Sequence, residues 1–337
     1  MKICIVTDSW QQINGVSTTL KNTVQCLQIQ GHEVLVIEPS LFKTIRCPFY
    51  PDIEISWNLG LVKNLIERFQ PEAIHIATEG PLGFAARWYC KVTKRQIPHN
   101  TSYHTNFPEY FKLQWGIPLW LSYRILRLFH KFSRRVLVTN QDMQTQLSAR
   151  GFENLVVWSR GVDLDLFTPN LRSFNTRDQL GISPIILCVS RASSEKNLDA
   201  FCKLTTAGTK ILVGDGPELL RLKRDYPDVK YLGWKTGQQL AEIYANADVF
   251  VFPSTTDTFG VVMLESISAG TPVVAYNAIG PREVIEPGVN GYINSDLNHA
   301  VTQALMLDRN QVRNSSQKWT WRKCTEVFLE NLAVIKT

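Results

Sequence analysis

Two carboxylates, Asp257 and Glu265, stand eight positions apart on either side of an expected helix start. The backbone amides of Phe259, Gly260 and Val261 open that helix, and free amides at a helix start favour phosphate. Glu265 lies on a helix whose other face is apolar, where a carboxylate costs free energy unless it accepts hydrogen bonds. A ribose diol offers two donors. The pattern predicts a ribose at Glu265 and sugar hydroxyls at Asp257, although the helix dipole alone would also explain Asp257.

Two cations, Arg191 and Lys196, follow the expected strand 185–189 on one loop. A pair of cations five positions apart can bind one diphosphate, and charge-assisted hydrogen bonds strengthen as a leaving diphosphate gains charge. A solvated charged loop would show the same spacing. The loop is therefore a candidate diphosphate site with a structural alternative.

Glycines mark two further turns. Asn14 and Gly15 precede an expected helix, where positive φ angles and free N–H groups would suit an anion, although a plain turn has the same sequence. Gly214 and Gly216, in a Gly-Asp-Gly-Pro turn, would let backbone approach a nucleotide, or would only close a βα unit. The sequence has no GxGxxG motif, which argues against a dinucleotide oxidoreductase.

Short β-rich runs alternate with helical patterns along the whole chain, which is typical of parallel sheets with crossover helices. The expected strands are 2–7, 33–37, 73–76, 101–103, 136–139 and 155–158, then 185–189, 210–213, 229–232, 249–252 and 272–275. Expected helices include 16–30, 61–68, 119–133, 218–226 and 238–245. The fold class is α/β, and 337 residues fit two domains.

The polar segment 170–184 places the domain boundary near residue 170. We expect domains at 1–170 and 171–316. Residues 317–337 should form an aromatic helix that docks on the first domain.

The chain resembles the retaining GT-B glycosyltransferases of the family 4 type over nearly its full length. The matching pieces occur in family order: Asn14-Gly15-Val16, Ser102-Tyr103-His104-Thr105-Asn106-Phe107, Arg160-Gly161-Val162-Asp163, Arg191 with Glu195-Lys196-Asn197, Gly214-Asp215-Gly216-Pro217, and the acids ending at Glu265. The Tyr-His-Thr-Asn-Phe and Thr-Asp-Thr-Phe-Gly stretches look most like bacterial α-mannosyltransferases and sulfolipid-type glycosyltransferases.

This resemblance implies two Rossmann-like domains facing across a cleft, and it implies roles for individual residues. Arg191 and Lys196 would bind the diphosphate, Glu265 the ribose, and Asp257 with the following amides the donor sugar. Gly15, Gly214 and Gly216 would approach the donor. His104 looks like the family's active-site histidine, although a structural histidine at a strand end is the alternative. Asn14, Tyr103 and Asn106 would lie on the acceptor side.

The implied activity is transfer of a mannose- or glucose-type hexose, with retention of configuration, to a lipid-linked or glycan hydroxyl. An epimerase or inverting transferase on the same fold, and a nucleotide-sugar-binding subunit without activity, stay open. The donor would be GDP-mannose or a UDP-hexose. Two features depart from the family: Asp257 stands where Glu is usual, and the segment from Pro39 to Leu59, where acceptor loops often lie, is short.

No metal or other cofactor is expected. The Asp163-Leu164-Asp165 motif has the spacing of metal-dependent transferases but lies at a domain edge, and we interpret it as structural. The seven cysteines are odd in number and show no CxxC pair, and Cys4 and Cys188 fall in expected strands, which suits buried thiols in a reducing cytosol.

Ten basic residues and one acid, Glu109, lie between Arg87 and Arg135, interleaved with aromatic side chains. The segment predicts an interfacial surface for anionic lipid, with 119–133 as its amphipathic helix. A solvated helix face with core aromatics is the alternative, and no nucleic-acid module is present. Without a signal peptide or a 20-residue apolar span, we expect a cytoplasmic protein, peripheral on the inner membrane face.

Overall fold

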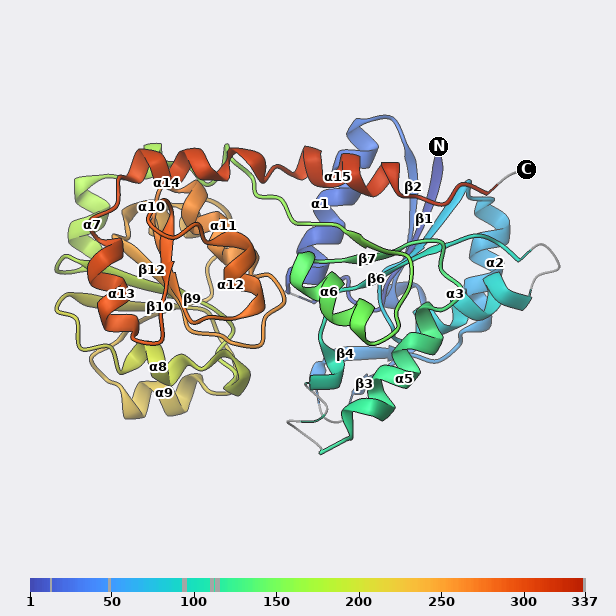
Figure 1. The fold of residues 1–337 in the computed structure, drawn as a ribbon, viewed down its shortest axis with the longest axis horizontal. Helices are drawn as coiled ribbons and strands as arrows, with labels where there is room; N and C mark the ends of the chain where they lie inside the picture. The colour runs from blue at the N-terminus through green and yellow to red at the C-terminus, as the bar shows by residue number, and fades with distance from the viewer. Residues whose placement is uncertain (13, 48–49, 93–95, 110–111, 113–115, 336–337) are drawn as a thin grey trace. The chain divides into compact units, whose positions relative to one another are not determined.

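The computed structural model describes residues 1–12, 14–47, 50–92, 96–109, 112 and 116–335 of the chain. It forms two compact units, Met1–Arg160 with Trp321–Thr337 (unit 1) and Gly161–Thr320 (unit 2), coloured along the chain in Figure 1. The division falls ten residues before the boundary expected near residue 170. Residues 161–170 belong to unit 2 because the Val162 amide donates to the Trp319 carbonyl at 2.9 Å and the Phe167 ring packs on Tyr244.

Unit 1 contains a six-stranded parallel sheet in the order β2-β1-β5-β6-β7-β8. Its strands are β1 (Lys2–Val6), β2 (Glu33–Ile37), β5 (Ala73–Ile76), β6 (Asn100–Tyr103), β7 (Val136–Val138) and β8 (Leu155–Val157). All six were expected from the sequence to within one residue at each end, because each is a short apolar or β-branched run bounded by polar residues.

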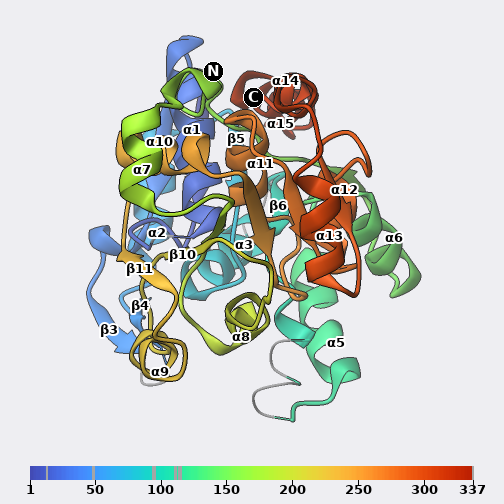
Figure 2. The same cartoon turned by 90° about the vertical axis from the view of Figure 1, so that its left-hand side faces the viewer.

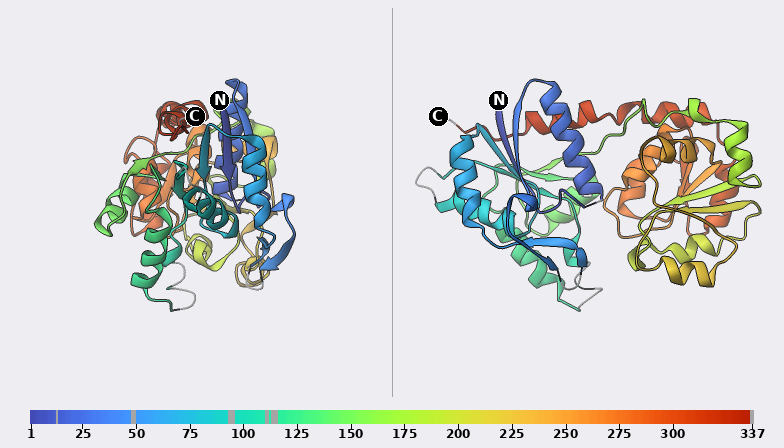
Figure 3. Two further views of the ribbon diagram at one scale, coloured as in Figure 1. Left: turned by 90° about the vertical axis from the view of Figure 1, so that its right-hand side faces the viewer. Right: turned by 180° about the vertical axis from the view of Figure 1, so that it is seen from behind.

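Alternate residues of these strands point to opposite faces, and a separate apolar cluster covers each face. One face packs against α1 (Gly15–Ile29) and α15 (Trp321–Glu330), with Ile3, Ile5 and Phe328 in its core. These two helices lie side by side (Figures 1 and 3). The other face, through Cys4 and Val6, packs against α2 (Gly60–Phe69), α3 (Pro81–Val92) and α5 (Leu119–His130).

The segment from Pro39 to Leu59 contains a hairpin that the sequence analysis did not expect. Strands β3 (Thr44–Cys47) and β4 (Tyr50–Ser56) pair antiparallel. Pro48 and Pro51 interrupt the apolar alternation and hide the strands, yet a two-stranded hairpin has enough free backbone positions to accept proline. Unit 1 also contains α6 (Gln141–Ala149) and the 3-10 turn η1 (Pro39–Leu41).

Unit 2 has its own six-stranded parallel sheet, in the order β11-β10-β9-β12-β13-β14. Its strands are β9 (Ile185–Val189), β10 (Thr209–Val213), β11 (Lys230–Gly233), β12 (Val249–Phe252), β13 (Val273–Ala275) and β14 (Gly291–Ile293). Counted from β9 this is the 3-2-1-4-5-6 order of doubly wound sheets. The sequence predicted all but β14, which is only three residues long.

Helices cover both faces of the second sheet (Figure 2). One face holds α7 (Phe174–Leu180), α10 (Gly237–Asn246), α11 (Val261–Ser268), α12 (Ile279–Val284) and α14 (Arg309–Ser315), and the other holds α8 (Leu198–Cys202), α9 (Leu219–Asp225) and α13 (Leu297–Ala304). The 3-10 turns are η2 (Pro169–Leu171), η3 (Ser194–Lys196) and η4 (Ser316–Lys318). Cys4 and Cys188 are buried, as predicted. Among the described residues, no helix is both long and apolar enough to cross a bilayer.

Candidate functional site

In unit 2, the strand order reverses between β9 and β12. Ligands of open α/β sheets bind at such a switch point, beyond the carboxyl ends of the strands. The loop after β9 carries Arg191 and Lys196, and the loop after β12 carries Asp257. The topology therefore brings three predicted site residues to the same edge of one sheet.

These two loops are bonded to each other. Lys196 Nζ donates to Asp257 Oδ1 at 2.6 Å, and both side chains are about three-quarters buried, with 22% and 24% of their surface exposed. The side-chain Nδ2 of Asn197 donates to the Pro253 carbonyl at 3.2 Å, and the Thr256 hydroxyl donates to the Glu195 carbonyl at 3.3 Å. The cation and the acid that the sequence assigned to neighbouring parts of one ligand are thus in direct contact.

Asp257 is held in its charged form. Burial acts to raise the pKa of this carboxyl, but the charge and hydrogen bond of Lys196 outweigh burial and hold the pKa below its usual value. Its second oxygen, Oδ2, is buried and has no hydrogen-bond partner among the described residues. That oxygen can accept a hydrogen bond from a ligand hydroxyl.

Glu265 lies one turn into α11, which begins directly after the Asp257 loop. It is partly buried, and burial raises the pKa of its carboxyl to about 7. Its Oε2 and the hydroxyl of the buried Tyr244 fall short of full hydrogen-bond geometry, yet the Tyr244 hydroxyl is the hydrogen-bonding neighbour that lowers the pKa of Glu265 against the effect of burial. Burial and the nearby Glu265 carboxylate raise the pKa of Tyr244 well above its ordinary value. A ligand with two hydroxyl donors would satisfy this costly carboxylate.

Gly214 and Gly216 pack against the backbone of the Arg191 loop. A Cβ at Gly214 would lie 1.9 Å from the Ser190 carbonyl oxygen, and one at Gly216 would lie 2.4 Å from that of Ala192. Both glycines have positive φ, of 138° and 154°. Their immediate role is to let two backbones touch, which fixes the loop on which Arg191 is exposed.

The start of α11 shows which parts of its residues can reach a ligand. Gly260, with φ of 89°, caps the helix, and no side chain bonds the first amides. The Phe259 ring is buried against Trp319, so only its backbone can face a ligand. Gly280 supports this loop from α12, where a Cβ would lie 2.5 Å from the Phe259 carbonyl. No local pattern in the sequence indicates this role of Gly280.

In unit 1, the turn before α1 differs from the expectation. Asn14 is extended, with φ of −154°, and Gly15 is helical, so neither residue uses the positive φ that an Asn-Gly pair allows. Asn14 Oδ1 instead accepts hydrogen bonds from the Val16 and Ser17 amides at 3.0 and 2.9 Å. The expectation failed because asparagine caps helices as readily as it forms left-handed turns. Gly15 itself is open, since none of the described residues has an atom within 4 Å of a Cβ added there.

His104 is buried at the end of β6 and bonded to Arg160. Arg160 Nη2 lies 2.7 Å from His104 Nδ1. Burial lowers the pKa of His104 well below its ordinary value, and the Arg160 charge and His75 lower it further. Arg160 lies in the Arg-Gly-Val-Asp stretch that resembles the family, but no role was predicted for it. Its contact with His104, 56 positions away, cannot be predicted from the sequence around either residue.

Tyr103 and Asn106 form a pair. Tyr103 is fully buried, and its hydroxyl donates to Asn106 Oδ1 at 3.0 Å. Tyr123 donates to the same oxygen at 3.2 Å. Tyr103 therefore orients Asn106 and does not reach the surface as an acceptor contact.

Asp8, which the sequence analysis passed over, occupies the switch point of the first sheet, between β1 and β5. It accepts hydrogen bonds from the Leu82 amide at 2.9 Å and from the Thr78 hydroxyl at 2.9 Å. Its carboxylate thus lies at the start of α3, where an anion would otherwise bind. Its position directly after the first strand was the signal available.

Asp163 belongs to a turn. Its Oδ1 accepts from the Asp165 and Leu166 amides at 3.0 and 2.9 Å. The structural interpretation of the Asp-Leu-Asp motif agrees with this geometry. Within the described ranges, no group of three or more His, Cys, Asp or Glu side chains is arranged to hold a metal ion.

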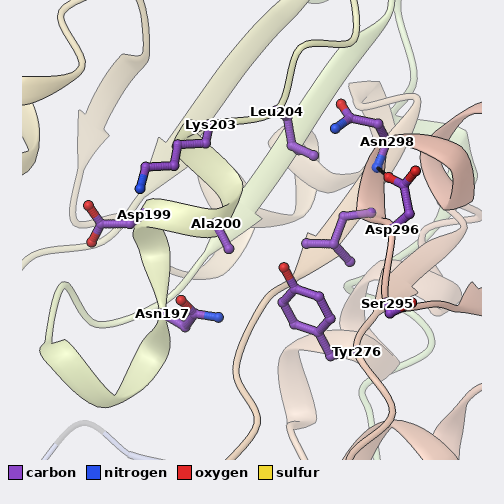
Figure 4. A pocket seen from close by; sticks show the side chains of 10 residues that line it. Asn197, Asp199, Ala200, Lys203, Leu204, Tyr276, Ser295, Asp296 and Asn298 are labelled. Atoms are coloured by element: carbon purple, nitrogen blue, oxygen red, sulfur yellow. Dashed lines mark hydrogen bonds between the residues drawn. The ribbon is translucent and has the colours of Figure 1, made fainter.

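A shallow hollow of about 470 Å³ lies between α8 and the start of α13 (Figure 4). Its polar groups are already used: Asn298 accepts from the Thr205 amide, Asp296 caps α13, and Asp199 pairs with Arg221. Neither Asp257 nor Glu265 lines it. Asn197, which follows Lys196, lines it, so the hollow borders the loop of Lys196 but contains none of the predicted site residues.

Comparisons with known proteins agree on one family. Residues 13–166 match the model of Glycosyltransferase Family 4, and residues 183–307 match that of Glycosyl transferases group 1.

Among curated proteins, the chain is 30% identical to a GDP-mannose-dependent alpha-mannosyltransferase of Mycobacterium tuberculosis, over 87% of this chain and 83% of that protein. It is also 30% identical to sulfoquinovosyl transferase SQD2 of Arabidopsis thaliana, over 93% of this chain and 69% of that protein. The solved structure of Anabaena HepE in complex with UDP and glucose superposes with a TM-score of 0.74 at 20% identity, covering 98% of both chains. This likeness shows that the two parallel sheets have the GT-B fold.

Proposed function

This chain belongs to glycosyltransferase family 4, and from that premise we propose that it moves a mannose- or glucose-type hexose from a nucleotide-diphosphate sugar to a lipid-linked or glycan hydroxyl, with retention of configuration. The observation that carries the proposal is the Lys196–Asp257 pair at the switch point of the second sheet, with Glu265 eight residues further on in α11. A cation and two carboxylates suit a ligand that is anionic in one part and rich in hydroxyls in the others.

The reaction breaks the bond between the anomeric carbon and the diphosphate oxygen and forms one from that carbon to the acceptor oxygen. The proton of the acceptor hydroxyl passes to the departing phosphate oxygen on the same face of the sugar. No protein nucleophile takes part. The protein acts by positioning the two substrates and by stabilising the charge of the leaving diphosphate.

The roles within unit 2 follow from charge. Arg191 binds the diphosphate, together with the α11 amides of Gly260 and Val261. Lys196 holds Asp257 and adds positive charge beside the leaving group, while Asp257 Oδ2 accepts from a sugar hydroxyl. Glu265 accepts from the ribose. Gly214 and Gly216 serve the donor by fixing the Arg191 loop.

The donor that we favour is GDP-mannose, because the Mycobacterium tuberculosis relative is named for that dependence. A thermal-shift series with GDP, UDP and ADP sugars tests it, since a ligand that binds only the folded state raises its stability as concentration exceeds Kd. Stabilisation by GDP-mannose alone supports this donor, and stabilisation by a UDP-hexose alone replaces it. No stabilisation by any nucleotide sugar contradicts the site.

The acceptor contacts belong to unit 1. Gly15, which is open in the structure, leaves room for a phosphate or for the acceptor, and Asn106, oriented by Tyr103, offers its amide nitrogen to an acceptor hydroxyl. Asn14 acts through the shape of the turn before α1, because its side-chain oxygen is used in the cap.

Two alternatives give different products. An inverting transferase yields the opposite anomer and an epimerase yields an altered nucleotide sugar, and NMR of the product separates both from the retaining reaction. A nucleotide-sugar-binding subunit would bind donor without turnover. Transfer or donor hydrolysis by the isolated chain rules that subunit out.

We also propose that no metal ion takes part, because Arg191 and Lys196 supply the positive charge and Asp163 is used in a turn. Activity that is lost with EDTA and restored by Mn²⁺ would overturn this.

A further proposed partner is an anionic membrane surface, bound through α3 and α5. Eight large apolar side chains there expose 38–66% of their surface: Phe84, Trp88, Val92, Trp120, Leu121, Ile125, Leu128 and Phe132. Seven basic side chains are exposed in the same segment: Lys91, Lys112, Arg124, Arg127, Lys131, Arg134 and Arg135. We call this set the α3–α5 face. Tyr123 and Phe129 are core, while Lys94, Arg95 and Trp115 lie outside the described residues.

The two helices lie together, since the Phe84 and Phe129 rings are 4.9 Å apart and the Lys91 ammonium lies 4.9 Å from the Phe132 ring. Exposed aromatics beside basic side chains suit the headgroup region of an anionic bilayer. The protein would then act at the inner membrane face, where a lipid-linked acceptor is present.

A further inference from the structure

Arg160 is the last residue of unit 1 before the chain enters unit 2, and its guanidinium is buried. Its Nη1 donates to the carbonyls of Trp158 at 3.0 Å and Ser159 at 3.3 Å. The guanidinium lies 5.2 Å from the centre of the Trp158 ring. Together these contacts hold the guanidinium in one orientation. In that orientation Nη2 points at His104 Nδ1, at a distance of 2.7 Å.

An arginine can only donate hydrogen bonds, because every nitrogen of the guanidinium carries hydrogen and the group keeps its proton in proteins. His104 Nδ1 must therefore accept. A neutral imidazole has one N–H and one bare nitrogen, so the proton of His104 lies on Nε2. Protonation of Nδ1 would set two donors against each other in a buried site.

The groups that face His104 oppose a charge on it. The Trp158 ring lies beside it, with ring centres 5.7 Å apart and planes tilted by 54°, and carries no charge. The Arg160 cation and His75 both act on the ring, and both favour its neutral form. His75 is itself buried, and burial lowers its pKa to about 3, so its ring is neutral and supplies no negative charge.

We infer that Arg160 is a positioning residue that fixes His104 as a neutral imidazole with its proton on Nε2, which makes this nitrogen a hydrogen-bond donor and not a base. The inference rests on the proposed function only for its effect on turnover. It also fits a reaction in which the departing phosphate takes the acceptor proton, because a ring held in this form has no free nitrogen to receive it.

The test is a long-range ¹H–¹⁵N NMR spectrum of the full chain labelled with ¹⁵N-histidine. The His104→Gln variant identifies the His104 signals by their loss. We expect a bare Nδ1 and a protonated Nε2 at every pH at which the protein is folded. A proton on Nδ1, or a ring that titrates near its ordinary pKa, overturns the inference. This result needs no substrate, so it is independent of whether the protein transfers a sugar.

Variants of Arg160 add a kinetic readout. Arg160→Met removes the donor, and we expect the proton to distribute over both nitrogens while kcat/KM falls about 10- to 100-fold, as in His104→Gln. Arg160→Lys restores a donor and should recover the Nε2 tautomer and part of the activity. The Arg160→Met, His104→Gln double variant should lose no more than the worse single variant. Multiplicative losses, or a wild-type tautomer in Arg160→Met, contradict a role through His104.

If Arg160→Met does not fold, the wild-type and Arg160→Lys spectra still decide the question. A chain with the expected tautomer but no transfer activity would refute the proposed function and leave the inference intact.

Discussion

Lys196 Nζ lies 2.6 Å from Asp257 Oδ1, and this bond joins the loops on either side of the switch point of the second sheet. The sequence assigned the lysine to a diphosphate and the aspartate to a sugar. In a sugar nucleotide these two groups are consecutive, so a contacting pair can serve both at once. The pair also explains why the buried aspartate stays ionised, since the lysine charge lowers its pKa against the effect of burial.

Breaking this pair should cost activity more than stability. We expect Lys196→Met and Asp257→Asn each to lower kcat/KM by about 100-fold or more, because each removes charge that is oriented toward the leaving group or the sugar. The double variant should be no worse than the poorer single variant, since the two residues act as a unit. Steady-state kinetics and thermal unfolding on the same samples measure both effects.

Lys203→Met is the matched control, because it removes an exposed lysine just after α8 and should keep full activity. Wild-type activity in Lys196→Met, or losses that multiply in the double variant, would contradict a shared role.

Glu265 should make stability depend on pH. In the folded protein the pKa of the Glu265 carboxyl is about 7, whereas the pKa of an ordinary glutamate is 4.5, so folding keeps the carboxyl protonated over this range. The free energy of unfolding should therefore fall as pH rises between these two values, because the folded state binds the proton more tightly. Thermal melts across this range should show the decline in wild type and a flatter profile in Glu265→Gln.

Donor affinity should change in the opposite direction. The ionised carboxylate accepts from both ribose hydroxyls, so binding of a nucleotide sugar should strengthen as pH rises through about 7. Calorimetric titration measures it. Identical pH profiles for wild type and Glu265→Gln would remove Glu265 from the ribose site.

The sequence predicted the sheets well because the strands are short apolar runs bounded by polar turns, and each of their two faces is buried. Ile185–Val189 and Val249–Phe252 were located to the residue. The hairpin of β3 and β4 was missed because prolines break its alternation, and β14 because three residues give too short a pattern.

Side-chain partners were predictable only where they follow from topology. Loops after β9 and β12 had to meet, which brought Lys196 near Asp257. The choice between a left-handed turn and a helix cap at Asn14 depends on backbone angles that the residue type leaves open. The contact of Arg160 with His104 spans 56 positions and depends on how β6 and the chain after β8 pack, which no local pattern records.

Two glycines should respond in opposite ways to alanine. Gly214→Ala places a Cβ 1.9 Å from a carbonyl oxygen at a φ of 138°, so the protein should lose stability and the Arg191 loop should shift. Gly15→Ala meets no atom of the described residues within 4 Å in a helical position, so stability should hold or rise by up to about 1 kcal/mol.

Activity separates the two proposed roles. If Gly15 leaves room for a phosphate or the acceptor, Gly15→Ala should lower kcat/KM while the melting temperature holds. Unchanged kinetics in a stable Gly15→Ala protein would show that the glycine serves only the turn.

The α3–α5 face should bind vesicles through both its charge and its apolar side chains. In flotation at low salt, we expect the wild-type protein to rise with vesicles that contain phosphatidylglycerol and to stay behind with phosphatidylcholine alone, because each basic side chain near an anionic surface contributes about 1 kcal/mol. Trp120→Ser with Ile125→Ser should reduce flotation, since these side chains expose 66% and 49% of their surface and make the apolar part of the contact.

Met306→Ser, which removes a side chain 85% exposed in unit 2, is the control and should float like wild type. Transfer to a water-soluble acceptor should be unchanged in all three proteins, because neither substitution touches the donor loops. Flotation that does not depend on anionic lipid, or that survives loss of Trp120 and Ile125 undiminished, would show that the face is a solvated surface.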